Sequence, residues 1–463
     1  MTARGITHTL RLLRHGELTA VEHVTAVLTA AGERDDLDAY VTVAGEEALR
    51  AAAHADARIR ALGPHAWRDM PLLGVTVSVK DLLQTGDLPT TRGSLLPNPR
   101  PPADAPAVAR LRAAGAVVVG KTATSEYGWS ASTVSRVGPP TRNPYDPRLT
   151  AGGSSGGAAA AVATALCDGS LGTDGSGSVR IPAAFCGVVG YKPTLGRIPY
   201  APNSADRLAH LGPLTRTVAD AALLTRVMAG PHPDDPDSAL TSTHTPRPAT
   251  ALRIGWIDHE GTTGEVRRVT AHARLALTAQ GHRVEDTRIP HHTRLYPALV
   301  DLLAACEAAD ARPEDDERAD AGRLEVIRHG RTLRAADVIR AEQVRQSLRT
   351  ALGALMTRYD VLAMATVPVE PFAADAVGPA WAADPATLQW LAWAPASYPF
   401  NMTGQPALSL PAGLTRSGLP VGVQLVGPVG GDDLVLSLAA RLESDLGTPV
   451  PPPARARRPA AAR

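Results

Sequence analysis

Cysteine is scarce in this sequence: the 463 residues include only Cys167, Cys186 and Cys306. Three widely separated cysteines cannot form the disulfide framework of a small secreted domain or a cysteine-rich zinc site. An odd number of cysteines is also typical of a reducing compartment. The composition therefore gives little support to redox chemistry.

The chain also lacks an excess of either charge and any long apolar run. Lysine and arginine together number 47 and the acidic residues 46, so the net charge is +1. A chain so nearly neutral has no strong field to attract nucleic acid or an anionic membrane. The sequence contains no run of about 18 apolar residues, and its first residues show no secretory signal pattern. We therefore expect a cytoplasmic protein with a small-molecule partner, no nucleic-acid partner and no membrane contact.

Lysine is much rarer than arginine. Of the 47 basic residues, only Lys80, Lys121 and Lys192 are lysines. Arginine keeps its proton in proteins, whereas lysine can give its proton up. A lysine retained in so arginine-rich a sequence is therefore a candidate for proton transfer. Survival by chance at the surface is the alternative for each of the three.

Short apolar strands alternate with helical segments over most of the chain. Residues 6–31 and 45–62 carry apolar side chains at helical spacing. From residue 71 onward strands alternate with helices, as in 111–122, and the second half restarts with a strand at 252–257. This alternation predicts the α/β class. The sequence has no repeat of the kind that builds a solenoid.

We predict three parts of the chain. Residues 1–65 form an N-terminal helical segment, and residues 66–450 form the main α/β domain. Within that domain, the Pro- and Asp-rich residues 230–250 form a long surface connection. Residues 451–463 form a basic Pro/Ala tail that has too few large apolar side chains to build a core, so we expect it to be disordered.

Two Gly/Ser clusters, residues 151–165 and 172–187, stand close together. Neither is a phosphate-binding loop, because the first lacks the Lys-Ser/Thr of a Walker A motif and the second lacks the glycine spacing of a dinucleotide fold. Residues 152–156 match the G-x-S-x-G nucleophile elbow, but prolines stand where its strand should be. A pair of flexible linkers is the simple alternative.

Five separated blocks of this sequence, in order, resemble the amidase signature family. They are VSVKD (77–81), GGSSGGAAAAV (152–162), GTDGSGSVRIPAAFCGVVGYKPTLGR (172–197), GPLTRTVADAALL (212–224) and FNMTGQPALSLPAG…GLPVGVQLVG (400–427). The resemblance implies a large, twisted, mixed β-sheet with helices on both faces. It also implies an amidase that converts a carboxamide to a carboxylate and ammonia or an amine, without a metal or an organic cofactor.

Carried onto this sequence, the family's triad falls on Lys80, Ser154 and Ser178, and the two serines keep the family's separation of 24 residues. The resemblance makes Ser178 the nucleophile, Ser154 a proton relay preceded by a cis peptide bond, and Lys80 the base. The lysine must then be uncharged. Moving its pKa from about 10.4 toward 7 costs about 4–5 kcal/mol, which burial and a hydroxyl neighbour can supply.

The resemblance places the oxyanion site on backbone N–H groups of the loop that contains Gly175, Ser176 and Gly177. Glycine lets a backbone approach its ligand closely. Ser176 departs from the family, which commonly has glycine at this position. We expect the main-chain donors to remain, while the side chain crowds the site or requires a conformation that glycine adopts freely.

Other residues in these blocks have supporting roles by resemblance. Ser155 is expected to hydrogen-bond locally. Asp174 and Arg180 are expected to brace the oxyanion loop, with a surface ion pair as the alternative. Lys121 and Lys192 are expected to hold carbonyl groups near the edge of the sheet.

Six of the 17 aromatic residues lie close together in the second half of the chain. They are Phe372, Trp381, Trp390, Trp393, Tyr398 and Phe400. In the family this region helps to form the acyl pocket, so we expect a substrate with an apolar or aromatic acyl group. Ordinary core packing is the alternative.

Two other functions stay open at this stage. The same triad serves the glutaminase-type A subunit of a tRNA-dependent amidotransferase, although no pair of residues maps onto a site for the glutamine carboxylate. A non-catalytic relative that only binds a ligand is the other, because Ser176 departs from the family pattern. The sequence leaves the natural amide and the oligomeric state open, including a homodimer.

Overall fold

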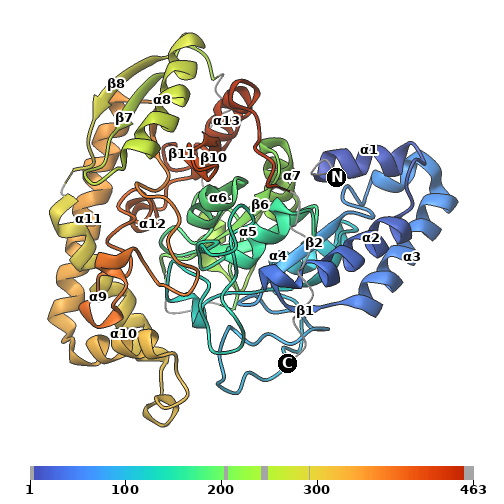
Figure 1. The fold of residues 1–463 in the computed structure, drawn as a ribbon, viewed down its shortest axis with the longest axis horizontal. Helices are drawn as coiled ribbons and strands as arrows, with labels where there is room; N and C mark the ends of the chain where they lie inside the picture. The colour runs from blue at the N-terminus through green and yellow to red at the C-terminus, as the bar shows by residue number, and fades with distance from the viewer. Residues whose placement is uncertain (1–4, 203–206, 241–248, 291, 453–463) are drawn as a thin grey trace.

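The structure is a computed structural model of the 463-residue chain, and it describes residues 5–202, 207–240, 249–290 and 292–452. Their strands form one sheet of eleven, in the order β1-β3-β2-β4-β6-β5-β10-β11-β9-β7-β8 (Figure 1). The strands are β1 (Tyr40–Val43), β2 (Thr76–Lys80), β3 (Val117–Thr122), β4 (Gly169–Asp174), β5 (Val189–Lys192), β6 (His210–Thr215), β7 (Arg253–Ile257), β8 (Arg283–Thr287), β9 (Val361–Ala365), β10 (Ala407–Leu414) and β11 (Pro420–Val426).

The sheet is mixed, which confirms the predicted fold class. β2 is parallel to β3 and β4, and β7 is parallel to β8 and β9. The other pairings among the described strands are antiparallel. Parallel neighbours end at the same edge of a sheet, so the residues that end β2 and β4 lie near one another.

Helices cover both faces of this sheet. They are α1 (Ile6–Arg14), α2 (Ala20–Glu33), α3 (Gly45–Leu62), α4 (Pro106–Ala113), α5 (Gly156–Ala163), α6 (Arg180–Cys186), α7 (Val218–Met228), α8 (Gly264–Ala279), α9 (His292–Asp310), α10 (Ala321–Thr332), α11 (Ala335–Arg358), α12 (Pro399–Thr403) and α13 (Asp432–Leu446). No helix in the described ranges combines the length and the apolar character needed to cross a bilayer.

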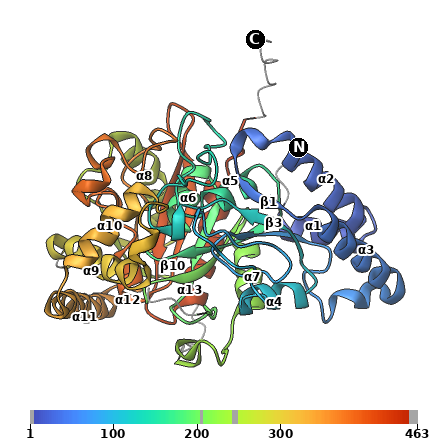
Figure 2. The same cartoon turned by 90° about the horizontal axis from the view of Figure 1, so that it is seen from below.

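Two groups of helices pack on the central strands. α5 and α6 pack on each other, α5 on β4 and α6 on β10 and β11. α8 and α13 also pack on each other and on β10, and α7 joins them through α13 and packs on β6. Because the groups share strands without packing on one another, they lie on opposite faces. Figures 1 and 2 show α1–α3 at one end of the molecule and α9–α11 at the other.

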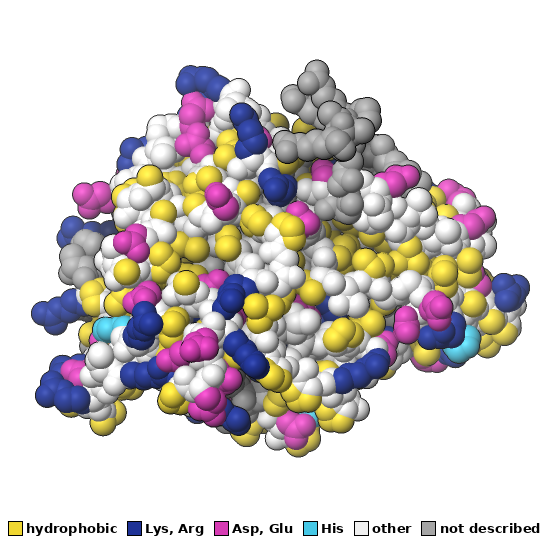
Figure 3. Space-filling view, turned by 60° about the horizontal axis from the view of Figure 1, so that its bottom comes forward, with side chains coloured by type: hydrophobic (Ala, Val, Ile, Leu, Met, Phe, Trp, Pro, Cys, Tyr) yellow, Lys and Arg dark blue, Asp and Glu magenta, His cyan; other side chains and the backbone are white. Residues whose placement is uncertain are grey.

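The N-terminal part of the chain is built into the sheet. Its described residues form α1, α2 and α3, as predicted, but also β1, which pairs with β3 at the sheet edge. The predicted domain boundaries at 65 and 450 remain predictions. Residues 241–248 of the predicted surface connection and residues 453–463 of the predicted tail lie outside the described residues. On the face shown in Figure 3, basic and acidic side chains are interspersed, in keeping with the balanced charge of the sequence.

A buried polar cluster ties α1 and α2 to the sheet. The carboxylate of Asp168, just before β4, lies 2.7 Å from Nε2 of His23 on α2, and both side chains are at least 95% buried. It also accepts hydrogen bonds from Thr9 of α1 and from the backbone and side chain of Thr76, which begins β2. Buried polar groups of this kind depend on their partners, because an unpaired donor or charge in the interior is costly.

We expect Asp168→Ala to destabilise the protein by about 3–5 kcal/mol, because it leaves His23 and the Thr76 donors without a buried partner. Thermal unfolding followed by circular dichroism measures this as a lower Tm. Asp258→Ala is the control, since the Asp258–Arg267 pair at 2.9 Å is about half exposed and should change stability by less than about 1 kcal/mol. Equal Tm values for the two variants would contradict the expectation.

Candidate active site

Lys80 ends β2 and is completely buried. Its Nζ donates hydrogen bonds to Oγ of Ser154, at 2.7 Å, and to Oγ1 of Thr173, at 2.8 Å. Thr173 belongs to β4, the parallel neighbour of β2, so the sheet itself brings the two residues together. Thr173 was not among the predicted site residues, although it stands in the second Gly/Ser cluster.

The charge of Lys80 is set by its surroundings. Burial lowers the pKa of Lys80 to about 7, while the negative charge of Asp174 opposes this shift. Both hydrogen-bond partners are neutral hydroxyls, so they do not hold the extra proton as a carboxylate would. A large fraction of this amine is therefore unprotonated near neutral pH and able to accept a proton.

Ser154 lies in the turn that leads into α5, and the Gly153–Ser154 peptide bond is cis, as the resemblance implies. The next residue couples this turn to the oxyanion loop. Ser155 donates from its backbone N–H to the carbonyl of Ser178, at 3.1 Å, and from its Oγ to the carbonyl of Thr173, also at 3.1 Å. Ser155 therefore hydrogen-bonds to β4 and to the oxyanion loop, and these two contacts are not the local ones that were expected.

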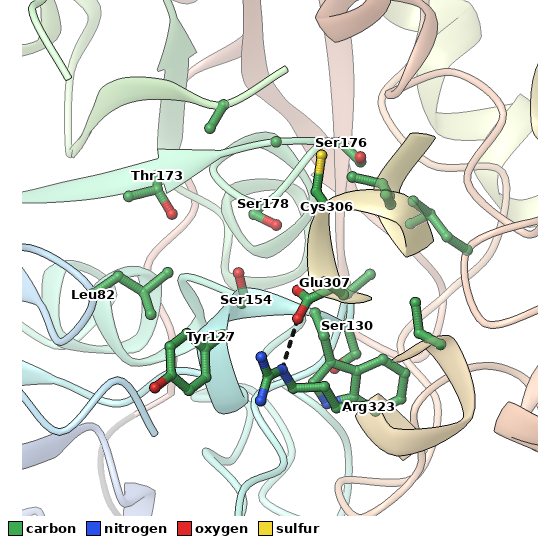
Figure 4. A pocket seen from close by; sticks show the side chains of 18 of the residues that line it. Leu82, Tyr127, Ser130, Ser154, Thr173, Ser176, Ser178, Cys306, Glu307 and Arg323 are labelled. Carbon is green, nitrogen blue, oxygen red and sulfur yellow. Dashed lines mark hydrogen bonds and ion pairs between the residues drawn. The ribbon is translucent and has the colours of Figure 1, made fainter. Parts of the chain in front are cut away.

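Ser178 lies between β4 and α6 and lines the same pocket as Ser154 and Thr173. Figure 4 shows the two serine hydroxyls turned toward the same space. No hydrogen bond joins the two Oγ atoms among the described contacts, so proton transfer from Ser178 to Ser154 requires a small side-chain movement. The structure thus brings Lys80, Ser154 and Ser178 into one site, with the lysine contact already made.

The oxyanion loop differs in one respect from the expectation. The N–H of Gly177 donates to Oδ1 of Asp174 at 2.7 Å, so it is not available to an oxyanion. In the described part of the chain, the N–H groups of Gly175, Ser176 and Ser178 have no hydrogen-bond partner. The donor set is therefore corrected by removing Gly177, because the Asp174 carboxylate already uses that N–H.

Asp174 and Arg180 form a fully buried ion pair, which excludes the surface alternative. Two guanidinium nitrogens of Arg180 each lie 2.9 Å from a carboxylate oxygen of Asp174. Arg180 also donates to the carbonyl of Ser397 and to the side chains of Asn401 and Gln424. Burial alone would raise the pKa of Asp174, but the Arg180 charge and hydrogen bonds hold it far below its usual range. The oxyanion loop is thus held by distant parts of the chain, through contacts that the sequence did not indicate.

Ser176 fits this loop without backbone strain, because its φ is not in the left-handed region that favours glycine. Its carbonyl accepts a hydrogen bond of 2.7 Å from Oγ of Ser397. Its own Oγ is buried and has no partner among the described residues. The expectation that serine would require a glycine-like conformation here is therefore wrong, while the effect of its side chain on substrate size stays a prediction.

The pocket wall contains fewer of the expected aromatic residues than the sequence suggested. Of the six, only Trp390 lines the pocket, beside Trp129, with ring centroids 6.1 Å apart. Trp393 stacks on Phe185 in the core, and Trp381 is 61% exposed. Core packing thus accounts for most of this aromatic segment.

The other two lysines hold backbone carbonyls, as expected. Nζ of Lys121 donates to the carbonyl of Leu83 and to Oγ1 of Thr90, both at 2.7 Å. Nζ of Lys192 donates to the carbonyl of Gln405. Within the described ranges, no three acidic, histidine or cysteine side chains converge as a metal-binding group would require.

Comparison with known proteins places this geometry in a family. The Amidase family model matches residues 22–436. The chain is 34% identical to the A subunit of the glutamyl-tRNA(Gln) amidotransferase of Synechococcus sp. (strain RCC307), over 93% of this chain and 95% of that protein. It is 36% identical to the putative amidase AmiA2 of Mycobacterium tuberculosis (strain ATCC 25618 / H37Rv), over 89% of this chain and 86% of that protein.

The fold comparison agrees with this result. A crystal structure of an amidase superposes with a TM-score of 0.82 at 31% identity, and the match covers 96% of this chain and all of the other. Sequence, fold and site therefore agree that the chain belongs to the amidase signature family of hydrolases that act on amide carbon–nitrogen bonds.

Proposed function

We propose that this amidase hydrolyses a carboxamide through an acyl-serine intermediate, with Ser178 as nucleophile, Ser154 as proton relay and Lys80 as base. The observation that carries the proposal is the 2.7 Å contact between Lys80 and Ser154, made by a buried lysine whose pKa is about 7. An unprotonated amine has a lone pair for the Ser154 proton, and a serine hydroxyl becomes a good nucleophile only when a base takes its proton.

The reaction moves a proton twice along the same path, first to Lys80 through Ser154 and then back. As Ser178 Oγ bonds to the amide carbon, its proton passes to Ser154, whose own proton passes to Lys80. The carbonyl oxygen becomes an oxyanion and accepts hydrogen bonds from the N–H groups of Gly175 and Ser176, which have no competing partner among the described residues. The C–N bond then breaks, and the leaving nitrogen takes the proton back from Lys80 through Ser154. A water molecule hydrolyses the acyl-Ser178 ester by the same path.

The composition of the pocket supports a lysine base. No histidine is among the described residues that line the pocket, although histidine is the usual base for a serine nucleophile. We propose further that the enzyme acts on small-molecule amides in the cytoplasm, which the scarcity of cysteine supports. Size-exclusion chromatography of the isolated chain tests for a homodimer.

A second candidate function is release of ammonia from glutamine for a partner protein. The 34% identity to the A subunit of an amidotransferase over nearly the whole chain favours it. A glutaminase assay, together with size-exclusion chromatography with and without candidate partner proteins, separates the two. Hydrolysis of simple carboxamides by the isolated chain supports the free-standing amidase, whereas glutamine-specific activity that needs a partner supports the second candidate.

We expect Ser178→Ala to lower ammonia release from a carboxamide panel by at least about 10⁴-fold, because it removes the nucleophile. The same substitution should abolish covalent labelling by a fluorophosphonate, detected by intact-protein mass spectrometry. Ser347→Ala is the control, since Ser347 is exposed on α11. Labelling of any other residue, or full activity of Ser178→Ala, would contradict the assigned role.

The pH dependence should report the state of Lys80. Burial lowers the pKa of Lys80 to about 7, and only the uncharged amine accepts a proton. We therefore expect kcat/KM to rise with pH through a midpoint near 7 and to fall about tenfold per pH unit well below it. Lys80→Arg should show no recovery at high pH, because arginine stays protonated. A profile that is flat from pH 5 to 9 in the wild type would rule out this base.

Gly128→Ala should disturb the relay without replacing any of its residues. Gly128 has a φ of +78°, and a Cβ added there would lie 3.2 Å from Ser154 Oγ and 3.0 Å from the Leu82 side chain. We expect kcat to fall by about 10²-fold, because small displacements of reacting groups are costly. Gly138→Ala is the matched control, since its Cβ would meet no atom within 4 Å. An unchanged kcat for Gly128→Ala would contradict the placement of Ser154 in the reaction.

A further inference from the structure

Two arginines lie in the pocket wall near the ring of Tyr127, and they differ in their partners. The guanidinium carbon of Arg323 is 4.1 Å from the centre of that ring. Arg323 is almost fully buried and is neutralised by two carboxylates, Glu307 at 2.7 Å and Glu126 at 3.7 Å. Figure 4 shows the Arg323–Glu307 pair at the opposite side of the pocket from Ser176. The charge of Arg323 is therefore already balanced within the protein.

Arg92 is the second arginine, and its charge is not used in this way. It lines the same pocket, is half-buried, and has its guanidinium carbon 5.6 Å from the Tyr127 ring. No carboxylate of the described residues lies within ion-pair distance of it. Asp310 also lines the pocket but is exposed. A cation in a partly dehydrated pocket without a counter-ion favours an anionic ligand group.

The position of Arg92 is fixed relative to the proposed triad. Its N–H donates to the carbonyl of Asp81, the residue after Lys80, at 3.0 Å. Its carbonyl accepts the N–H of Tyr127 at 2.8 Å, and the next residue, Gly128, lies against the Ser154 hydroxyl. The backbone of Arg92 is thus held between the segment that carries the base and a segment that lies against the relay.

A guanidinium forms two parallel hydrogen bonds with a carboxylate, a geometry that lysine does not reproduce. We propose that Arg92 binds a carboxylate of the substrate, so that the preferred substrates are amides that carry a carboxylate away from the scissile carbonyl. This inference rests on the proposed amidase function. The carboxylate can belong to the acyl part, as in a monoamide of a dicarboxylic acid, or to the amine part, as in an N-acylated amino acid.

The test compares each acid with its neutral methyl ester. The acyl-side pair is glutaramic acid and its methyl ester, and the amine-side pair is N-acetyl-β-alanine and its methyl ester, with glutamine as a further carboxylate-bearing amide. Release of ammonia or amine is measured for the wild type, Arg92→Gln, Arg92→Lys and Arg349→Gln. Arg349 is the matched control, because it is exposed on α11 and far from the pocket lining.

We expect Arg92→Gln to lower kcat/KM for the preferred acid by about 10- to 100-fold, mainly through KM, because the contact is made equally in the ground and transition states. The ester should change by less than about threefold, Arg92→Lys should recover part of the loss, and Arg349→Gln should behave as wild type. Which pair responds identifies the side that carries the carboxylate. Equal losses for acid and ester, or no preference of the wild type for either acid, would overturn the inference.

A binding measurement separates this inference from the proposed function. Ser178→Ala enzyme, with and without Arg92→Gln, is titrated calorimetrically with glutaramic acid, N-acetyl-β-alanine and their esters. Weaker binding of an acid alone on loss of Arg92 supports the carboxylate site even without turnover. If the wild type hydrolyses the amide bond of the methyl esters but Arg92→Gln does not weaken the binding of either acid, the inference fails while the amidase function stands. If no amide is hydrolysed but binding of an acid is still weakened by Arg92→Gln, the proposed reaction fails and the carboxylate site stands.

Discussion

The site depends on a lysine that is buried without a carboxylate partner. Among the described residues, Lys80 donates hydrogen bonds only to the hydroxyls of Ser154 and Thr173, and the nearby charge of Asp174 is paired with Arg180. Lys121 is the useful contrast, because Asp81 lies 3.6 Å from it and burial lowers its pKa only to about 8. A carboxylate partner stabilises the ammonium form of a lysine, so a similar pair at Lys80 would raise its pKa and make it a poorer proton acceptor near neutral pH. The absence of such a pair near Lys80 is therefore as important as the hydrogen bonds it makes.

The mixed sheet explains how this arrangement is held. Parallel pairing of β2 with β4 brings Lys80 to Thr173, and the antiparallel return of β6 along β4 closes the base of the oxyanion loop. The loop itself is supported from the second half of the chain, where Ser397, Asn401 and Gln424 surround the Arg180 guanidinium. The two halves of the chain therefore share one site, and neither half contains a complete one.

The sequence predicted the site residues that belong to local motifs and missed the interactions that depend on contacts between distant parts of the chain. The scarcity of lysine and the two Gly/Ser clusters pointed to candidate regions, and the resemblance to the amidase signature family then implied Lys80, Ser154 and Ser178. Gln424 could not be found in this way, because its contact with Arg180 spans 244 positions. The aromatic residues from Phe372 to Phe400 left two interpretations open, since composition does not distinguish a pocket wall from a core. β1 was missed because a four-residue edge strand between two helices has almost no periodic signal.

The departure at Ser176 becomes understandable from the backbone of the oxyanion loop. Only Gly177, with a φ of +121°, needs glycine there, and a Cβ on it would also lie 2.6 Å from the side chain of Ser397. Its N–H donates to Asp174, as does that of Val179, so the residue that must be glycine helps to support the loop. The preceding position keeps an ordinary backbone conformation and a free N–H, both of which serine provides as well as glycine. Serine at 176 therefore changes the side chain at this position of the loop, while the proposed main-chain donors stay in place.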